Sequence, residues 1–324
     1  MRNVSRALVT GGAGFIGSHI VDELTSRGVE TYVIDDLSTG SLENLSSHKE
    51  NGLVHTILGD ARELESQLRG IEIDIVFHEA AIASVPRSVS HPMIVHDANV
   101  NMTLNILNYC VKAGVKRLIF ASSAAIYGIL DGKAVEDMVG RPNSPYGASK
   151  LAVEDYLHAY HHSYGLETVA LRYFNVYGKR QRYSDYSGVI TVFANKILDG
   201  ERPTIYGDGA QVRDFVHVHD IVQANMLAME SQVAVGESFN VASGKATSIL
   251  ELFNIIKDLV GSTSLENVFA PPRVGDMKLG LASIDKIKAA LGYAPRIRMR
   301  DGLAEVIEYL AKPQAPRIRA GEVA

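Results

Sequence analysis

Residues Leu8–Ile20 read LVTGGAGFIGSHI, and this stretch decides the fold. Its apolar start indicates the end of a buried strand, and the residues after its glycines indicate a helix. Gly12, Gly14 and Gly17 match the pattern G-x-G-x-x-G. Gly11 opens the alternative pattern G-x-x-G-x-x-G. Such a turn lets a pyrophosphate lie against backbone N–H groups at the positive end of the following helix, so the stretch predicts a phosphate site.

An acidic residue follows at a spacing typical of dinucleotide sites. Residues 30–34 indicate a second strand, which ends in Asp35, 18 residues after Gly17. In such sites a carboxylate roughly 20 residues after the turn receives a ribose 2′-hydroxyl. A Gly-rich turn alone is a weak signal, but strand, turn, helix, strand and acid in this order favour a dinucleotide site over a structural turn. Asp35 and Asp36 would repel a 2′-phosphate, so the predicted cofactor is NAD rather than NADP.

The composition excludes several classes of protein. The chain has 324 residues, 46% of them hydrophobic, which favours about two domains. Its net charge is −5 and no basic run stands out, so neither nucleic acid nor an anionic membrane is an expected partner. A strand pattern begins close to Met1 and no apolar run approaches a membrane span, so we expect a soluble, cytoplasmic protein without a signal peptide. The single cysteine, Cys110, excludes an intrachain disulfide and lies in a pattern typical of a buried helix residue.

Short apolar segments alternate with longer amphipathic ones over the first half of the chain. This alternation predicts an α/β fold with a doubly wound parallel sheet, the Rossmann fold, whose ligands gather beyond the carboxyl ends of the strands. The predicted strands are residues 7–10, 31–34, 54–58, 73–78, 117–122 and 168–173. The predicted helices are residues 15–26, 99–113 and 146–164.

The alternation weakens from about residue 174 onward. We therefore expect an NAD-binding domain over residues 1–173 and a smaller, substrate-binding α/β domain over residues 174–324. A helix at Asp220–Glu230 and a strand at Ser238–Val241 are expected to return to the first domain, within a segment near residues 214–242. The two domains are thus predicted to interleave.

The second half contains the stretch PTIYGDGAQVRDFVHVHD at residues 203–220. It predicts a strand, a Gly-rich hairpin and a second strand. His217 and His219 would face the same side of that second strand, but no third ligand appears at a useful spacing. Packing is therefore favoured over a metal site, and residues 312–324 are predicted to form a frayed tail.

Several predicted strands end in residues suited to the ligand edge of the sheet. Asp60 is placed to accept from an adenine amino group, or to serve as an ordinary turn residue. Ala80 and Ala81 are small enough for a cofactor, or equally a packed helix, to approach the backbone. Asn99 and Asn101 open a helix, where they would also serve as caps.

A tyrosine and a lysine follow a serine-ended strand. In RLIFASSAAIYG, residues Arg117–Gly128, the apolar run stops at Ser122 and Ser123. Tyr146 and Lys150 then lie four residues apart, on one face of a helix that starts at a Ser-Pro pair. We expect the ammonium to stabilise the phenolate and lower its pKa towards neutrality, so that Tyr146 can remove a proton from a sugar or alcohol hydroxyl.

Seven motifs spread over nearly the whole chain carry a family resemblance. They are TGGAGFIGSH at 10–19, DDLSTG at 35–40, HEAA at 78–81, SSAAIYG at 122–128, YGASK at 146–150, RYFNVYG at 172–178 and RDFVHVHD at 213–220. With them the chain resembles the extended short-chain dehydrogenase/reductase family and, within it, the nucleotide-sugar 4-epimerases typified by UDP-glucose 4-epimerase.

The resemblance implies a role for individual residues. Ser123 matches the catalytic serine, Tyr146 the base, and Lys150 the residue that holds the nicotinamide ribose. The expected cofactor-binding residues are Gly11, Gly14, Phe15, Ile16, Gly17, Asp35, Asp36, Leu37, Ser38, Gly40, Asp60, Ala61, Glu79, Ala80, Ala81, Ala83, Asn99, Ser122, Tyr146, Lys150, Tyr173 and Val176. The expected substrate-binding residues are Val85, Ser123, Tyr146, Asn175, Val189, Thr204, Tyr206, Arg213, Arg273 and Asp276. Among the latter, the resemblance puts Tyr206 beside the uracil, Arg213 and Arg273 on phosphate, and Asp276 on the uridine ribose.

Two departures from relatives narrow the implied reaction. The 4,6-dehydratases of this family carry an Asp-Glu pair directly after the catalytic serine or threonine, and the decarboxylating synthases carry a Glu two places after it. Ala124 and Ala125 occupy these positions here. Reactions beyond oxidation and re-reduction at C4 therefore lack their acid/base group. The implied function is an NAD-dependent UDP-hexose 4-epimerase; a UDP-glucuronate 4-epimerase, a dehydratase or reductase, and a non-catalytic NAD-binding protein remain alternatives.

The resemblance also bears on specificity and assembly. Gly280 stands where several narrow-specificity epimerases have a tyrosine in the sugar pocket, so a 2-acetamido group is a further expected substrate feature. Family likeness implies a homodimer joined through the helices at Asn99–Ala113 and Tyr146–Tyr164.

Overall fold

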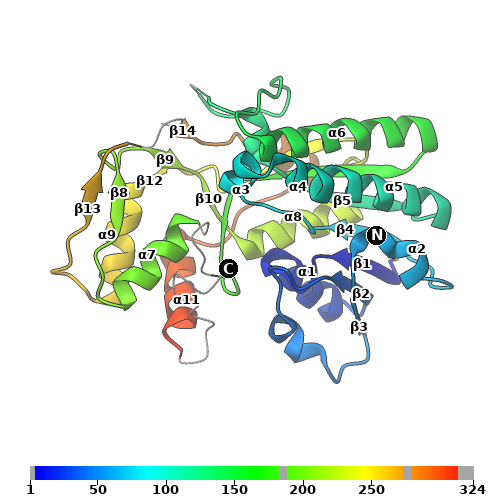
Figure 1. The fold of residues 1–324 in the computed structure, drawn as a ribbon, viewed down its shortest axis with the longest axis horizontal. Coiled ribbons are helices and arrows are strands. Elements are labelled where there is room, and N and C mark those ends of the chain that lie inside the picture. The colour runs from blue at the N-terminus through cyan, green and yellow to red at the C-terminus, as the bar shows by residue number, and fades with distance from the viewer. Residues whose placement is uncertain (1–3, 131, 183–187, 273–278, 313–324) are drawn as a thin grey trace.

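The computed structural model describes residues 4–130, 132–182, 188–272 and 279–312, which form a seven-stranded parallel sheet flanked by helices (Figure 1). The strands are β1 (Arg6–Thr10), β2 (Glu30–Asp35), β3 (Val54–Leu58), β4 (Ile75–His78), β5 (Arg117–Ser123), β6 (Glu167–Tyr173) and β11 (Ser238–Val241). Their order is β11-β6-β5-β4-β1-β2-β3, and each neighbouring pair is parallel. The order reverses between β1 and β4, where a doubly wound sheet binds its ligands. The predicted Rossmann fold is confirmed.

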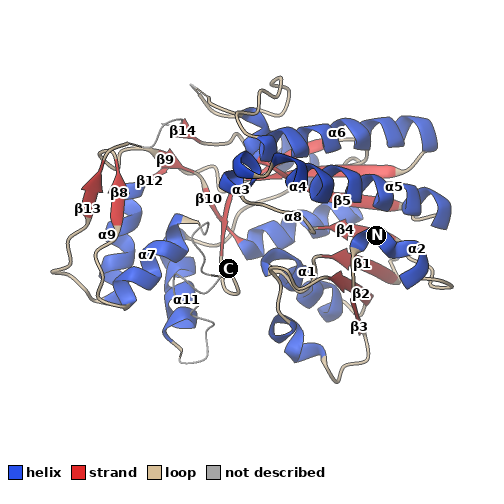
Figure 2. Cartoon of the chain, viewed as in Figure 1, coloured by secondary structure: helices blue, strands red, loops and turns tan. Residues whose placement is uncertain are grey.

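Helices cover both faces of the sheet because its strands are apolar on both sides (Figure 2). The long helices are α1 (Phe15–Ser26), α5 (Met102–Ala113), α6 (Pro145–Tyr164) and α8 (Val218–Glu230). Shorter helical segments are η1 (Leu42–His48), η2 (Ala61–Glu63), α2 (Leu64–Gln67), α3 (Val85–Ser90), α4 (Pro92–His96), η3 (Asp97–Asn101) and η4 (Ala124–Tyr127). Ala7 and Val9 of β1 belong to the core under α1 and α8, whereas Leu8 belongs to the core under α5 and α6.

A second group of elements lies to one side of the large sheet (Figure 1). Its helices are α7 (Val189–Leu198), α9 (Ile249–Val260) and α11 (Met299–Ala311), and its strands are β8 (Thr204–Tyr206), β9 (Val212–Arg213), β12 (Thr247–Ser248), β13 (Val268–Ala270) and β14 (Leu279–Gly280). Phe193, Phe253 and Leu303 form part of a core separate from those of the sheet. This group belongs to the region expected to bind substrate; the boundary near residue 173 stays a prediction.

The connections between the two groups run through the second half of the chain. β7 (Asn175–Tyr177) pairs with β10 (Phe215–His217), directly before α8. α8 packs against α1, and β11 extends the large sheet by pairing with β6. α10 (Asp285–Leu291) then packs against β11 before the chain passes to α11. The chain thus crosses back and forth between the two groups after residue 173.

The expected hairpin within residues 203–220 is wrong. β8 pairs in parallel with β13, while β9 pairs with β12 and β14. Gly207 and Gly209 both have positive φ and do turn the chain. The backbone N–H of Leu250 donates to the carbonyl of Gly209, and that of Ile249 to the carbonyl of Gln211. The turn is therefore attached to the start of α9 instead of closing a hairpin.

The expectation that His217 and His219 share a strand face is also wrong. β10 ends at His217 and α8 begins at Val218. Nδ1 of His217 accepts a hydrogen bond from the backbone N–H of His219 at 3.3 Å, so His217 caps the helix that His219 has already entered. The described residues hold no cluster of three or more His, Cys, Asp or Glu side chains placed for a metal ion.

Two further expectations concern the cysteine and membrane-spanning helices. Cys110 is fully buried in α5, as its helical pattern predicted. Within the described part of the chain, no helix combines the length and the apolar character needed to cross a bilayer.

Candidate active site

The glycine turn between β1 and α1 is closed by tight backbone contacts. Gly11 has φ +69°, and a Cβ atom there would lie 2.8 Å from the backbone nitrogen of Ala80. A Cβ atom at Gly17 would overlap the carbonyl oxygen of Gly11 and lie 2.8 Å from Cα of Gly12. Among the described residues, no side chain caps α1 at Gly14, and the first turn carries no acidic residue. The turn thus offers free helix N–H groups and a cradle without side chains, which fits a pyrophosphate.

Asp35 lies at the end of β2, beside this turn. Its Oδ2 accepts a hydrogen bond from the backbone N–H of Ala13 at 3.0 Å, and its Oδ1 accepts one from Leu37 at 2.8 Å. Burial raises the pKa of the Asp35 carboxyl, and these two N–H donors oppose that shift. The carboxylate is therefore fixed in orientation next to Gly40, whose missing Cβ leaves it room. The ribose contact of Asp35 stays a prediction, as do the roles of its neighbours Asp36, Leu37 and Ser38.

Asp60 follows β3 and shows the turn role that its position also allowed. Its Oδ1 accepts from the backbone N–H of Arg62 at 2.9 Å, which caps η2. The same carboxylate forms an ion pair with the Arg62 guanidinium at 2.6 Å. Ala61 is buried directly behind it. The adenine contact of Asp60 stays a prediction, and it would have to share the carboxylate with Arg62.

Asn99 joins the end of β4 to α6. Its Oδ1 accepts from the backbone N–H of Ile82 at 2.9 Å, and its Nδ2 donates to Oγ of Ser149 at 3.0 Å. Asn99 therefore does not cap a helix; it lies inside the π-helical turn η3, which leads into α5. Asn101 stands at the N-cap position of α5, but its side chain makes no capping bond among the described contacts, because its Nδ2 donates to Asp97 within the same turn. This linkage holds the loop of residues 79–83 against the helix that carries Tyr146.

Ser123, Tyr146 and Lys150 come together at the carboxyl end of β5. Ser144 caps α6 by accepting from Gly147 N at 3.1 Å, so the helix start is fixed one residue before Tyr146. The Ser123 side chain lies beside the Tyr146 phenol, close enough to lower the pKa of its hydroxyl. Nζ of Lys150 donates to the carbonyl oxygen of Ala121 at 2.7 Å and lies 6.0 Å from the centre of the Tyr146 ring. Tyr146 is 9% exposed and Lys150 3%.

The expectation that Lys150 lowers the pKa of Tyr146 towards neutrality is wrong for this arrangement. Burial raises the pKa of the phenol, the Ser123 side chain lowers it, and the Glu79 carboxylate raises it. The ammonium is 6.0 Å from the ring centre and bound to a carbonyl, so its influence is small. Burial also lowers the pKa of Lys150 to about 8, against the pull of Glu79 and Glu154. Lys150 is thus mostly an ammonium at neutral pH.

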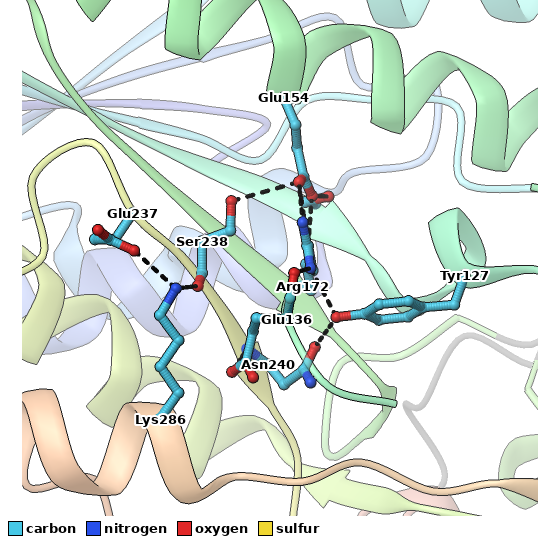
Figure 3. A network of polar contacts seen from close by, with 9 residues as sticks. Tyr127, Glu136, Glu154, Arg172, Glu237, Ser238, Asn240 and Lys286 are labelled. Atoms are coloured by element: carbon cyan, nitrogen blue, oxygen red, sulfur yellow. Dashed lines mark hydrogen bonds and ion pairs between the residues drawn. The ribbon is translucent and has the colours of Figure 1, made fainter. Parts of the chain in front are cut away.

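A buried network behind these residues fixes α6 to the sheet (Figure 3). Glu154 lies one further turn along α6 from Lys150, and its Oε2 is 2.7 Å from Nη2 of Arg172 on β6. Ser122, the neighbour of Ser123, donates to Oε1 of Glu154. Arg172 also donates to the hydroxyl of Tyr127 at 2.8 Å. The network thereby joins the catalytic helix to the ends of β5 and β6.

The sequence reasoning missed Glu154 and Arg172, although two signals were present. Glu154 repeats the four-residue spacing of Tyr146 and Lys150, so it had to lie on the same helix face. Arg172 directly follows the apolar residues 169–171 of a buried strand, where a charge needs a buried partner.

Glu154→Gln is expected to destabilise the protein by about 3 kcal/mol, because the amide leaves the buried Arg172 charge without a counter-charge. Urea unfolding followed by circular dichroism measures this. Glu237→Gln is the matched control: its carboxylate pairs with Lys286 at 2.7 Å but is 48% exposed, so its loss should matter little. Equal effects of the two changes would contradict the role given to the buried pair.

The expected substrate residues lie on elements of both groups. Val85 begins α3, Asn175 begins β7, Val189 begins α7, Thr204 and Tyr206 bound β8, and Arg213 ends β9. Arg273 and Asp276 lie outside the described residues. Asn175 donates to the carbonyl of Asp214 at 3.0 Å, and a Cβ atom at Gly280 would lie 3.3 Å from Cδ of Arg213. Gly280 therefore borders the arginine expected on the diphosphate.

The parallel sheet, the cofactor-shaped turn and the Ser123–Tyr146–Lys150 cluster define the class of dinucleotide-binding Rossmann proteins. Residues 7–242 match the NAD dependent epimerase/dehydratase family, and the chain belongs to this family. It is thus an NAD-dependent enzyme, and its relatives place it among the isomerases.

Three solved structures illustrate the similarity. A UDP-glucose 4-epimerase from Thermotoga maritima, with UDP-glucose, is 39% identical with a TM-score of 0.86, over 94% of this chain and 98% of that one. A UDP-N-acetylglucosamine 4-epimerase from Methanobrevibacter ruminantium, in complex with UDP-N-acetylmuramic acid, is 40% identical with a TM-score of 0.89, over 95% and 99%. A UDP-glucuronic acid 4-epimerase variant from Bacillus cereus, in complex with NAD and a fluorinated UDP-glucuronic acid, is 30% identical with a TM-score of 0.87, over 94% and 98%.

Proposed function

We propose that this chain is a UDP-hexose 4-epimerase that retains its NAD and interconverts UDP-glucose and UDP-galactose, and also their 2-acetamido counterparts. The observation that carries the proposal is that Ser123, Tyr146 and Lys150 lie together at the carboxyl end of β5. Ala124 and Ala125 follow Ser123, where a dehydratase would need carboxylates. Neither alanine can supply the second acid/base group that a dehydratase needs.

In the proposed mechanism, each residue acts on the C4 alcohol or on the cofactor. NAD, when bound, supplies the acceptor and donor of the C4 hydride. Tyr146 removes the O4 proton and later returns it, and the Ser123 hydroxyl, which lies beside the phenol, holds O4 by a hydrogen bond of its own. Because burial and Glu79 raise the pKa of Tyr146, proton removal depends on positive charge brought to the site, which the oxidised cofactor would supply when bound. Lys150 and Asn99 hold the loop and helix that frame the reacting centre.

Both faces of C4 must meet the same cofactor, so the 4-keto sugar has to turn about its diphosphate link. A sugar that turns cannot be clamped tightly, and binding energy has to come from the UDP part. Asn175, Tyr206 and Arg213 are the described residues proposed for that task. A guanidinium suits the diphosphate because its fork donates parallel hydrogen bonds.

A substrate panel tests the proposal. The purified enzyme is incubated with UDP-glucose, UDP-N-acetylglucosamine and UDP-glucuronate, and the products are separated by chromatography. We expect the 4-epimers of the first two, since Gly280 leaves no side chain in front of Arg213. Conversion of UDP-glucuronate alone would favour the glucuronate epimerase. A 4-keto or 6-deoxy product would show that the enzyme is a dehydratase. No turnover on any nucleotide sugar would show that the chain is a non-catalytic NAD-binding protein.

We further propose that the enzyme is a cytoplasmic homodimer joined through α5 and α6. Tyr156 and Tyr164 of α6 and Val111 of α5 expose apolar surface on these helices. Light scattering should give twice the mass of the chain, and a monomer would contradict this interface.

A further inference from the structure

A carboxylate is held at the end of β4 by a hydrogen-bond chain with a fixed direction. Nδ2 of Asn225 donates to the hydroxyl oxygen of Tyr173 at 2.7 Å, and also to the carbonyl of Ile221 at 3.0 Å. The carbonyl can only accept, so it fixes the orientation of the Asn225 amide. The Tyr173 oxygen accepts from that amide, and its own proton therefore points to Oε1 of Glu79, 2.9 Å away. Glu79 is thus presented with a donor, which favours its ionised form.

The charge of Glu79 acts on Tyr146 and Lys150 of the catalytic helix. Lys150 lowers the pKa of Glu79 and Glu79 raises that of Lys150, while burial raises the pKa of Glu79 to about 7. Tyr146 also senses the carboxylate, which raises its pKa. The adjacent His78 is neutral, because burial lowers its pKa to about 3. Lys150 donates to the Ala121 carbonyl at 2.7 Å, whereas the Glu79 carboxylate accepts from the Tyr173 phenol, so the two charges act on each other without forming an ion pair among the described contacts.

The backbone of Glu79 also adjoins the glycine turn. A Cβ atom at Gly11 would lie 3.1 Å from the carbonyl carbon of Glu79 and 2.8 Å from the nitrogen of Ala80. The residue accordingly stands between the phosphate cradle and the helix that carries Tyr146. A dinucleotide with its pyrophosphate on the cradle and its reacting ring at Tyr146 must run past it.

We propose that Glu79 is a charge-balancing residue of this site, whose carboxylate stabilises the cationic, oxidised nicotinamide over the neutral, reduced one. The inference rests on the proposed function, because it assumes that the nicotinamide ring reacts beside Tyr146. Hydride transfer moves two electrons from the C4–H bond to the ring and removes its positive charge, while the O4 proton passes to Tyr146. Glu79 keeps its proton state and its bond to Tyr173 throughout. Its charge thus opposes ring reduction and favours return of the hydride to the sugar.

Redox titration of the bound cofactor tests this proposal without any sugar. The holoenzyme and Glu79→Gln are equilibrated at pH 8 with a reference couple of known potential, and bound NADH is read at 340 nm. At the potential where the parent holds equal amounts of both forms, the variant should hold about ten reduced cofactors for each oxidised one. This tenfold change is the size expected when a charge interaction worth about one pKa unit is lost. An unchanged ratio would overturn the proposal.

Two companion variants keep the test decisive. Glu237→Gln removes one surface carboxylate by the same substitution and should leave the ratio at the parent value. Tyr173→Phe keeps the Glu79 side chain but removes its donor, so it should shift the ratio in the same direction at pH 7 and by less at pH 9, where the carboxylate is ionised without help. If Glu79→Gln does not fold, the Tyr173→Phe result decides, and equal ratios at both pH values would refute the assignment. Because no sugar is present, failure of the epimerase assignment would leave this measurement unaffected.

Discussion

Tyr146→Phe is expected to lower kcat on UDP-glucose by about a thousandfold while the NAD content stays at the parent level. The change removes the hydroxyl that meets Ser123 but keeps the buried ring. Packing is therefore preserved, and the group that accepts the O4 proton is lost. Turnover is measured by a coupled assay for UDP-galactose, and NAD by release with acid.

Tyr160→Phe is the matched control for this experiment. Tyr160 lies on the same helix, and its hydroxyl donates to Oδ1 of Asn108 at 2.8 Å. The substitution therefore removes one hydroxyl and one hydrogen bond. It lies outside the site, so kcat should stay within twofold of the parent value, a change of about 0.4 kcal/mol or less. A folded, NAD-bound Tyr146→Phe enzyme that turned over at the parent rate would rule out Tyr146 as the base.

Gly17→Ala is expected to abolish NAD retention. The new Cβ atom would overlap the carbonyl oxygen of Gly11 and press on Cα of Gly12 at 2.8 Å, and neither backbone atom can rotate away. The turn has to open, which separates the N–H groups that face the pyrophosphate and costs about 2 kcal/mol of folding stability. NAD per protein, read after acid release, should fall below about one tenth of the parent level, an effect of about 1.4 kcal/mol or more.

Gly132→Ala gives the comparison for this change. A Cβ atom at Gly132 has no neighbour within 4 Å, so both NAD content and thermal unfolding should match the parent. Full NAD retention by Gly17→Ala would show that the turn does not form the phosphate cradle.

The parallel sheet could be predicted because each strand carries its own signal. β1, β5 and β6 are buried on both faces, and each contains a run of consecutive apolar residues, at 7–9, 118–121 and 169–171, which singles out a strand without knowledge of its partners. The ends were less certain: β5 continues to Ser123, since a polar residue at the edge can still pair with Tyr173. The glycine turn was predictable for the same local reason.

Strand pairings and pKa shifts that depend on residues far along the chain could not be predicted from local sequence patterns. β8 pairs with β13 and β9 with β12 and β14, and strands of two or three residues carry no pattern that names a partner so far along the chain. The pKa of Tyr146 was mispredicted because spacing places Lys150 nearby but does not reveal burial or the Ala121 carbonyl that binds its ammonium.

The fate of the hydrogen on C4 tests the central claim most directly. UDP-glucose deuterated at C4 is incubated with the enzyme as purified, with no NAD added, and the UDP-galactose formed is examined by mass spectrometry. Retained NAD that takes the deuteride and returns it to the other face predicts product with the full label. Loss of the deuterium to water, or a need for added NAD, would contradict the proposed mechanism.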